Sequence, residues 1–128
     1  MRLLLDTHTF LWLLESPEKL SGTALEACKN LENELWLSTV VAWEIQIKSQ
    51  LGRLTLEVPL SEMIQGQRVA NTLEILPVEL EHVLELGNLP PHHKDPFDRL
   101  LIAQARVENL HFVTGDGVIP QYEVAVLW

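Results

Sequence analysis

Short apolar segments alternate with segments of helical periodicity along this chain, and the alternation restricts the folds open to it. Strands that are apolar throughout are buried on both faces, as in a parallel sheet covered by helices. The sequence therefore predicts an α/β fold with three layers, α/β/α, around a central, mainly parallel sheet. The expected strands are residues 2–6, 35–38, 73–78, 110–114 and 122–128, and the expected helices are residues 7–16, 21–34, 39–52, about 60–71, 79–88 and 97–109.

The length and composition fit one domain. The chain has 128 residues, 47% of them hydrophobic, which is enough for a substantial core, so we expect a single domain over residues 1–128. Gly52 is expected to end the helix before it, and residues 53–58 to be extended. No apolar run reaches the roughly 20 residues of a membrane span, and no secretion signal is evident. Together with a single cysteine, Cys28, expected in the core, these features predict a cytoplasmic protein.

The chain is acidic, with a net charge of −9. Simple nucleic-acid-binding modules usually carry a basic patch, so this charge argues against that class. Of the 18 acidic residues only four are aspartates, namely Asp6, Asp95, Asp98 and Asp116. Glutamate is a good helix former, whereas aspartate favours helix caps and strand ends. The aspartates therefore mark special positions in the chain.

Two of the aspartates follow predicted strands. Asp6 closes the segment 2–6, and Asp116 lies in the turn "TGDG" after the segment 110–114. In parallel α/β sheets, ligands bind beyond the carboxyl ends of the strands, where both side chains are expected. Each residue also has a structural explanation, because Asp6 equally fits a helix N-cap and an Asp between glycines is common in turns.

Glu44 lies within the predicted helix 39–52, whose faces can be separated at about 100° per residue. The apolar residues within roughly 60° of Glu44 on this helix are Val40, Val41, Ile47 and Leu51. A carboxylate that is buried without a partner costs several kcal/mol and needs a cation, a metal or a proton. An ion pair with Lys48, one turn later, is the alternative to a metal.

Asp98 stands in the first turn of the helix predicted over residues 97–109. The apolar residues that share its face are Leu101, Ile102 and Ala105. Asp95 precedes Pro96, the pattern of an N-cap followed by proline at the first helical position, so we assign Asp95 a structural role. Capping does not need a second aspartate three residues later, which makes Asp98 a functional candidate.

The acids of four separate segments are thus expected near the carboxyl edge of the sheet or on helix faces that pack towards it; they are Asp6, Glu44, Asp98 and Asp116. Four such acids repel one another unless a positive charge lies among them. Ligands that are all oxygen favour a hard divalent cation, so we predict Mg²⁺ or Mn²⁺. Such a site suits phosphodiester hydrolysis, in which one metal lowers the pKa of the attacking water and a second stabilises the leaving oxygen.

Four pieces of the sequence, in their order and spacing, resemble the PIN-domain ribonucleases, and specifically toxins of the VapC type from prokaryotic toxin–antitoxin pairs. They are "LLLDTHTFLW", "STVVAWEIQIKSQLGRL", "LPPHHKDPFDRLLIAQA" and "HFVTGD". The resemblance covers essentially the whole chain. It implies a PIN-like fold and catalytic, metal-binding acids at the same four positions. Asp116 is the most variable of them in the family, so an outer or second-metal role stays open for it.

The resemblance also implies what the site does and what the protein binds. It implies a Mg²⁺- or Mn²⁺-dependent endoribonuclease that is the toxin of a type II toxin–antitoxin system, and it implies a homodimer. A small VapB-type antitoxin is expected to wrap the toxin and to place a basic side chain near the acids. The acidic surface of this chain suits such a partner.

Three further residues are candidates for supporting roles. The Thr114 hydroxyl, two residues before Asp116, is placed to orient a carboxylate or a metal-bound water, although a β-branched strand residue is equally expected there. Lys94 and Arg99 flank Asp98 and are candidates for contacts to RNA phosphates, with solvated surface charge as the alternative.

The histidines near these acids receive no role. His92 and His93 next to Asp95 form too weak a pattern to predict zinc. His8 is close to Asp6 in sequence, but a metal-bound water needs no histidine base.

The tryptophans are assigned by their apolar surroundings. Trp12, Trp36 and Trp43 are expected in the core, and Trp128 at a dimer contact.

Two other phosphate-handling folds fit the sequence poorly. A haloacid-dehalogenase-like phosphatase needs a second aspartate two residues after Asp6, where this chain has His8. A receiver-type domain needs an acidic pair after its first strand and an aspartate after its third, and neither is evident. The alternative from another class is a catalytically weak, PIN-like module that acts through a protein partner. Acids at all four positions argue against it.

Overall fold

The computed structural model describes residues 1–128 and contains one sheet of five parallel strands in the order β3-β2-β1-β4-β5. The strands are β1 Arg2–Leu5, β2 Glu34–Ser38, β3 Glu74–Leu76, β4 His111–Val113 and β5 Val126–Leu127. Strand β1 is central, with Leu4 paired to Trp36 on one side and to Phe112 on the other. Its three leucines are fully buried, as an apolar strand inside a parallel sheet requires.

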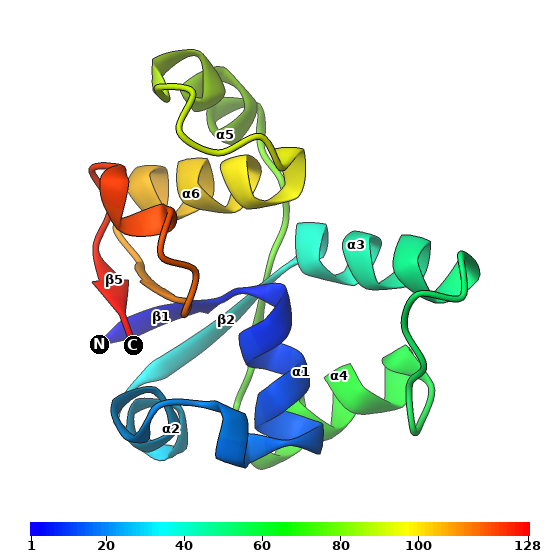
Figure 1. The fold of residues 1–128 in the computed structure, drawn as a ribbon. Helices are drawn as coiled ribbons and strands as arrows, with labels where there is room; N and C mark the ends of the chain where they lie inside the picture. The colour runs from blue at the N-terminus through cyan, green and yellow to red at the C-terminus, as the bar shows by residue number, and fades with distance from the viewer.

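Six α-helices flank the sheet, and five of them lie on its two faces. They are α1 Thr7–Glu15, α2 Gly22–Lys29, α3 Thr39–Gln50, α4 Leu60–Ala70, α5 Leu80–Glu85 and α6 Pro96–Glu108, with short 3₁₀ helices at Pro17–Lys19, Leu86–Asn88 and Ile119–Gln121. Helices α5 and α6 lie above the sheet in Figure 1, and α1, α2 and α4 lie below it. The predicted three-layer α/β architecture is confirmed, and the sheet is parallel throughout.

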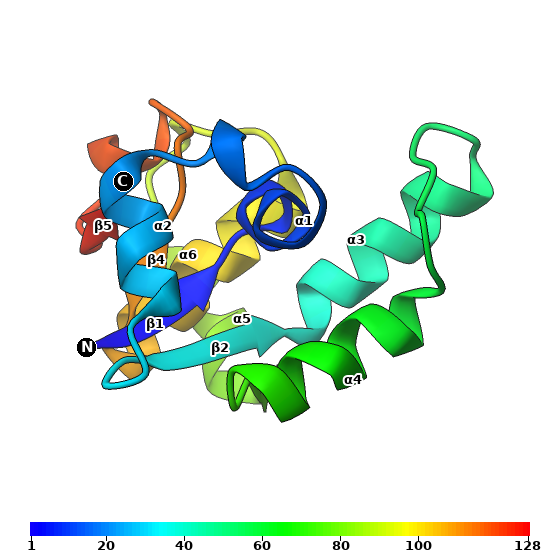
Figure 2. The same ribbon diagram turned by 90° about the horizontal axis from the view of Figure 1, so that it is seen from below.

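Two helices begin directly at the end of a strand, and this brings their first turns to the carboxyl edge of the sheet. Asp6 follows β1 and caps α1, while Ser38 ends β2 and caps α3 through the Val40 amide at 3.0 Å. Figure 2 shows α3 continuing outwards from the end of β2, next to α4, rather than lying flat on the sheet. Helix α3 ends before Gly52, whose φ of +72° lies in the left-handed region that favours glycine.

A single cluster of 28 buried residues forms the hydrophobic core. Its largest fully buried side chains include Phe10 of α1 and Phe112 of β4. Cys28 is buried, as expected, and burial raises the pKa of its thiol to about 11. No helix is long and apolar enough to span a membrane.

Some element boundaries differ from the prediction. Residues 53–58 form no strand, α2 ends at Lys29, and α5 is only six residues long before it continues as a 3₁₀ helix. Of the last expected strand, only Val126–Leu127 pairs, alongside β4 at the edge of the sheet. An edge strand has one partner only, so an apolar pattern alone does not determine how far its pairing extends.

The tryptophans are only partly where the sequence predicts them. Trp12 and Trp36 pack against the core, but Trp43 is 58% exposed, so its assignment to the core is wrong. Its indole lies edge-on to Phe97 with the ring centroids 5.0 Å apart. Leu51, predicted on the same apolar face as Glu44, is also exposed, at 60%. Helix α3 extends beyond the sheet, so its later turns have less core to contact than its first turn.

Candidate metal centre at the carboxyl edge of the sheet

The four acids singled out in the sequence line one pocket of about 440 Å³ at the carboxyl edge of the sheet. They are Asp6 after β1, Glu44 on α3, Asp98 at the start of α6 and Asp116 after β4. Asp95, Lys19 and Lys48 also line this pocket. The fold therefore brings together side chains that are up to 110 residues apart, from Asp6 to Asp116.

Asp6 is held rigidly by the junction of β1 and α1. One carboxylate oxygen accepts the Thr9 amide at 2.7 Å, so the residue caps α1 as well as facing the pocket. The Thr9 hydroxyl donates to the Val113 carbonyl at 2.8 Å, which ties this first turn to β4. The two explanations weighed for Asp6 are thus compatible, because capping uses only Oδ1 and leaves Oδ2 free for a ligand.

Glu44 is buried in the pocket wall, with an exposed fraction of 3%. Its carboxylate has two partners within the chain. One carboxylate oxygen accepts the Thr7 hydroxyl at 2.8 Å, and the other pairs with the Lys48 ammonium one helical turn later. The ion pair considered from the sequence does form. It does not remove Glu44 from the pocket, which Glu44 and Lys48 line together.

Asp98 stands in the first turn of α6, which begins as predicted. Asp95 caps the helix by accepting the amides of Phe97 at 2.8 Å and Asp98 at 3.3 Å, and Pro96 occupies the first turn. Burial, followed by the charge of Asp95, raises the pKa of Asp98 from 3.8 to about 7; Glu44 and Asp6 add to the rise, and His93 opposes it. The carboxylate form is therefore unfavourable here unless a cation joins the pocket.

Asp116 is placed by a tight turn after β4. Its amide donates to the Thr114 hydroxyl at 3.2 Å, and its Oδ1 accepts the Val118 amide at 2.9 Å. Thr114 is buried and thus supports the backbone of Asp116 rather than its carboxylate. Gly115 leaves room for the indole of Trp128, because a Cβ at residue 115 would lie only 2.8 Å from that ring. Trp128 lines the pocket from this position, and its predicted dimer contact stays a prediction.

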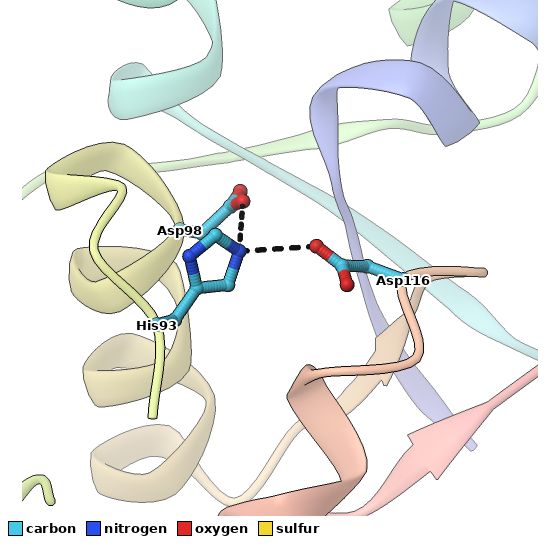
Figure 3. Close-up of side chains that lie close together, drawn as sticks. All are labelled: His93, Asp98 and Asp116. Carbon is cyan, nitrogen blue, oxygen red and sulfur yellow. Dashed lines mark hydrogen bonds and ion pairs between the residues drawn. The ribbon is translucent and has the colours of Figure 1, made fainter. Parts of the chain in front are cut away.

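His93 is the residue that sequence reasoning missed. Its Nε2 lies 3.0 Å from Oδ2 of Asp98 and 3.0 Å from Oδ2 of Asp116, so the ring joins α6 to the turn after β4 (Figure 3). One ligand atom from each of these three residues lies within 4.8 Å of the others. The signal available in the sequence was the position of His93 five residues before Asp98 in a proline-rich loop, but nothing local indicated the contact with Asp116.

The two cations proposed for phosphate binding have different surroundings. The Arg99 guanidinium donates to the Pro90 carbonyl at 2.9 Å and to the Tyr122 hydroxyl at 3.3 Å, so it holds the loop before α6. Lys94 is exposed and forms no ion pair. Their contacts to RNA stay predictions, and the structure shows another group of cations, two of which line the acidic pocket.

That group lines a second pocket of about 430 Å³ that shares several residues with the acidic one. Its cations are Lys19, Lys48 and Arg53, three of the nine lysines and arginines in the chain. Trp12 lies in both pockets, with the Lys19 ammonium 5.9 Å from its ring and the His8 ring at 5.3 Å. A basic and aromatic groove therefore opens beside the acidic pocket, although the net charge of the chain is −9.

Comparison with known proteins agrees with this arrangement. The family model of the PIN domain matches residues 3–125. The chain belongs to the PIN domain family. PIN domains are typically metal-dependent nucleases, and the acidic cluster of this member is consistent with a PIN-domain metal site. No curated protein matches the sequence.

Solved structures with the same fold come from complexes of several bacteria. VapBC2 from Rickettsia felis, bound to a DNA fragment from its promoter, has a TM-score of 0.70 and 17% identity over 98% of this chain and 97% of that chain. FitAcB from Neisseria gonorrhoeae has a TM-score of 0.60 and 19% identity over 97% and 95%. A toxin–antitoxin complex from Klebsiella pneumoniae has a TM-score of 0.56 and 15% identity over 88% and 85%. At these identities the likeness shows the PIN fold.

The residues present fit a hard divalent cation. The ligands offered are carboxylate oxygens, which Mg²⁺ and Mn²⁺ prefer. The pKa of Asp98 is raised first by burial and then by the neighbouring acids, so a positive charge among them would stabilise these carboxylates. A divalent cation at this position would supply that charge.

Proposed function

We propose that this PIN domain is a Mg²⁺- or Mn²⁺-dependent endoribonuclease. The observation that carries the proposal is the gathering of Asp6, Glu44, Asp98 and Asp116 around one pocket, where burial and the neighbouring acids raise the pKa of Asp98 to about 7. Such a site has too much negative charge to bind an RNA phosphate on its own. A divalent cation would convert it into one that attracts a phosphodiester.

The four acids would divide the work by their environment. Asp6 and Asp98 each present oxygen to the pocket from a rigid helix start, and Asp116 does so from the turn after β4, so these three would hold the metal. Glu44 is engaged by Thr7 and Lys48 and would hold a bridging water or a second ion. When bound, the cation would lower the pKa of a water next to the scissile phosphate and offset the charge of the transition state.

RNA would be held by the groove defined by Lys19, Lys48, Arg53 and Trp12. Cations beside the acidic pocket would attract the phosphates that flank the scissile bond, and the half-buried indole of Trp12 would offer an aromatic face on which an unpaired base stacks. This arrangement favours single-stranded or loop RNA, because paired bases have no free face to stack.

The direct test is cleavage of a structured RNA by the purified protein, free of any partner, with and without Mg²⁺ or Mn²⁺. We expect cleavage with either ion, loss of cleavage with EDTA, and loss in Asp6→Asn while the circular dichroism spectrum stays native. Metal-assisted hydrolysis does not need the 2′-hydroxyl, so a single-stranded DNA of the same sequence is included to define the substrate class.

Two results would count against this proposal. Cleavage that persists in EDTA would remove the metal from the mechanism. Metal binding without cleavage of any RNA would instead support the alternative, a catalytically weak module that acts through a protein partner.

We further propose that the protein is the toxin of a type II toxin–antitoxin pair and acts in the cytoplasm, where its RNA substrates are. The support is the shared fold with a toxin–antitoxin complex and with two-component complexes such as VapBC2. The partner would be a small VapB-type antitoxin with a basic side chain that enters the acidic pocket. Expression of this chain alone should arrest growth, and Asp98→Asn should relieve the arrest.

A homodimer also stays a proposal. Exposed apolar side chains on α5 would suit it, since Leu80 is 72% exposed and Leu84 66%. Sedimentation of the wild type and of Leu84→Glu would test whether this helix carries the contact.

A further inference from the structure

The ring of His93 has hydrogen-bond partners on both of its nitrogens, and these partners restrict where its proton lies. The Asp95 backbone amide donates to Nδ1 at 3.1 Å. An amide nitrogen can only donate, so Nδ1 must present its lone pair and carry no proton. In the neutral ring the proton is therefore on Nε2, which faces Oδ2 of Asp98 and Oδ2 of Asp116 at 3.0 Å each (Figure 3).

The hydrogen bond from the Asp95 amide to Nδ1 makes His93 a poor metal ligand. A metal bound at Nε2 would need the lone pair of that nitrogen, and the proton would then move to Nδ1. There it would point at the Asp95 amide, so two donors would face each other and the hydrogen bond would be lost. Although His93, Asp98 and Asp116 have the spacing of a metal site, the backbone selects the tautomer that donates.

The backbone of the loop holds this ring in place. The His93 amide donates to the hydroxyl of Tyr122, a residue that is only 4% exposed, at 2.7 Å. Arg99 donates to the same hydroxyl and to the Pro90 carbonyl. Asp95, whose amide contacts the ring, also caps the helix that carries Asp98. His93 and Asp98 thus belong to one rigid unit at the start of α6.

Asp116 does not belong to that unit, because it follows β4. Its Oδ1 accepts an amide of its own turn, from Val118, and its Oδ2 meets the His93 ring. The Nε2–H group is therefore the hydrogen bond that joins the carboxylate of Asp116 to the α6 side of the pocket.

We propose that His93 is a positioning residue, which donates its Nε2–H to Asp98 and Asp116 and holds the two carboxylates together, and that it is not a third metal ligand. This inference rests on the proposed metal site for its consequence, but the hydrogen bonds themselves are those that the structure shows. The Nε2–H uses one oxygen of each carboxylate and leaves Oδ1 of Asp98 free for an ion. These two hydrogen bonds would hold the carboxylates of Asp98 and Asp116 near each other before the ion binds. Binding would then cost less side-chain conformational entropy.

Two substitutions test separately the donor role of Nε2 and the acceptor role of Nδ1. In His93→Gln the side-chain amide reaches the position of Nε2 and donates there, without the lone pair that an imidazole offers to a metal. In His93→Asn the shorter side chain accepts from the Asp95 amide, as Nδ1 does, but does not reach the carboxylates. The neighbouring His92, which is exposed, offers the matched control His92→Gln.

The first measurement is made without any activity. A long-range ¹H–¹⁵N spectrum of the metal-free protein, with His93 assigned through His93→Gln, should show a protonated Nε2 and an unprotonated Nδ1. Addition of Mg²⁺ alone should leave this tautomer unchanged. A proton on Nδ1, or loss of the Nε2 proton when Mg²⁺ is added, would overturn the proposal.

The second measurement is the dissociation constant of Mg²⁺ by calorimetry. We expect His93→Asn to weaken binding by about 10- to 100-fold, the usual effect of removing a group that orients a ligand, and His93→Gln to weaken it by less than about 3-fold. Hydrogen exchange of the Val118 amide should quicken in His93→Asn and not in His93→Gln or His92→Gln. Equal losses for Gln and Asn would contradict the donor role. If the wild type bound no Mg²⁺, the proposed function would fail, whereas the spectrum would still decide the tautomer.

Discussion

Glu44 and Asp98 line the same pocket from two different helices, and their carboxylates have different neighbours. Glu44, on α3, is the more deeply buried, yet it has the Lys48 ammonium and the Thr7 hydroxyl as partners. Asp98, at the start of α6, has a histidine and four further acids around it, and its pKa rises to about 7. Two buried carboxylates of one pocket therefore differ in the charges that surround them.

The difference divides the pocket into two sides, one around Glu44 on α3 and one around Asp98 at the start of α6. The Glu44 side is balanced within the chain, so it is stable whether or not a metal is present. Around Asp98 the acids outnumber the one histidine in contact, so a proton or a cation from outside would supply the balance, as the proposed metal site requires. Substitutions on one side of the pocket should therefore have different effects from substitutions on the other.

The largest effect is expected from Asp98→Asn, which removes the unbalanced charge. Loss of a metal ligand should remove several kcal/mol of transition-state stabilisation, so RNA cleavage should fall by roughly 1,000-fold. The metal-free protein should at the same time become more stable to urea at pH 8, because no carboxylate has to be buried. A variant that kept full activity would show that Asp98 is not part of the site.

The free energy of unfolding, measured without added metal, should depend on pH because of Asp98. The pKa of Asp98 is about 7 in the folded protein and 3.8 in the unfolded chain, so the folded state binds more protons between these values. Its free energy of unfolding should therefore fall as the pH rises from about 4 to 7, by roughly 4 kcal/mol from this residue, and level off above that. The affinity for Mg²⁺ should rise over the upper part of the same interval. Urea titrations at several pH values test this, and the slope should flatten in Asp98→Asn.

Lys48→Met should leave the carboxylate of Glu44 without a cationic partner in the chain. The buried carboxylate would keep the Thr7 hydroxyl but lose its cation, which should lower the free energy of unfolding by about 2 kcal/mol at pH 8. Adding Glu44→Gln should recover most of that loss. The exposed Lys29 at the end of α2 offers the control Lys29→Met, which should be neutral. A double variant no more stable than Lys48→Met would show that the ion pair is not what stabilises this side.

The smallest effect is expected in the groove beside both acids. Arg53→Gln should weaken binding of single-stranded RNA a few-fold and reduce the slope of log K against log salt by roughly 0.7, the share of one phosphate contact. Binding is measured with Ca²⁺ in place of Mg²⁺ to slow cleavage. Arg68→Gln on α4, outside the groove, should leave both values unchanged. An unchanged salt slope in Arg53→Gln would place the RNA elsewhere.

Local signals in the sequence were sufficient for the layers of the fold and for the starts of its helices. Leu3 to Leu5 form a wholly apolar strand, as expected in a parallel sheet covered on both faces, and Asp95 with Pro96 mark where α6 begins. The direction in which α3 projects was not available, because helical periodicity shows which residues share a face but not whether that face meets a core. Trp43 was misplaced for this reason.

The sequence by itself indicated which residues meet in the pocket, since the four acids follow predicted strands or lie on apolar helix faces that pack towards a parallel sheet. Only the tertiary structure decided how their charges are balanced. Lys48 neutralises Glu44 through a contact within one helix, which a sequence pattern can suggest. His93 joins Asp98 to Asp116 across 23 residues of sequence, and the cations of the groove come from separate elements. Side chains that meet through the fold leave no periodic signal, because their distance depends on how the strands pair and not on their separation along the chain.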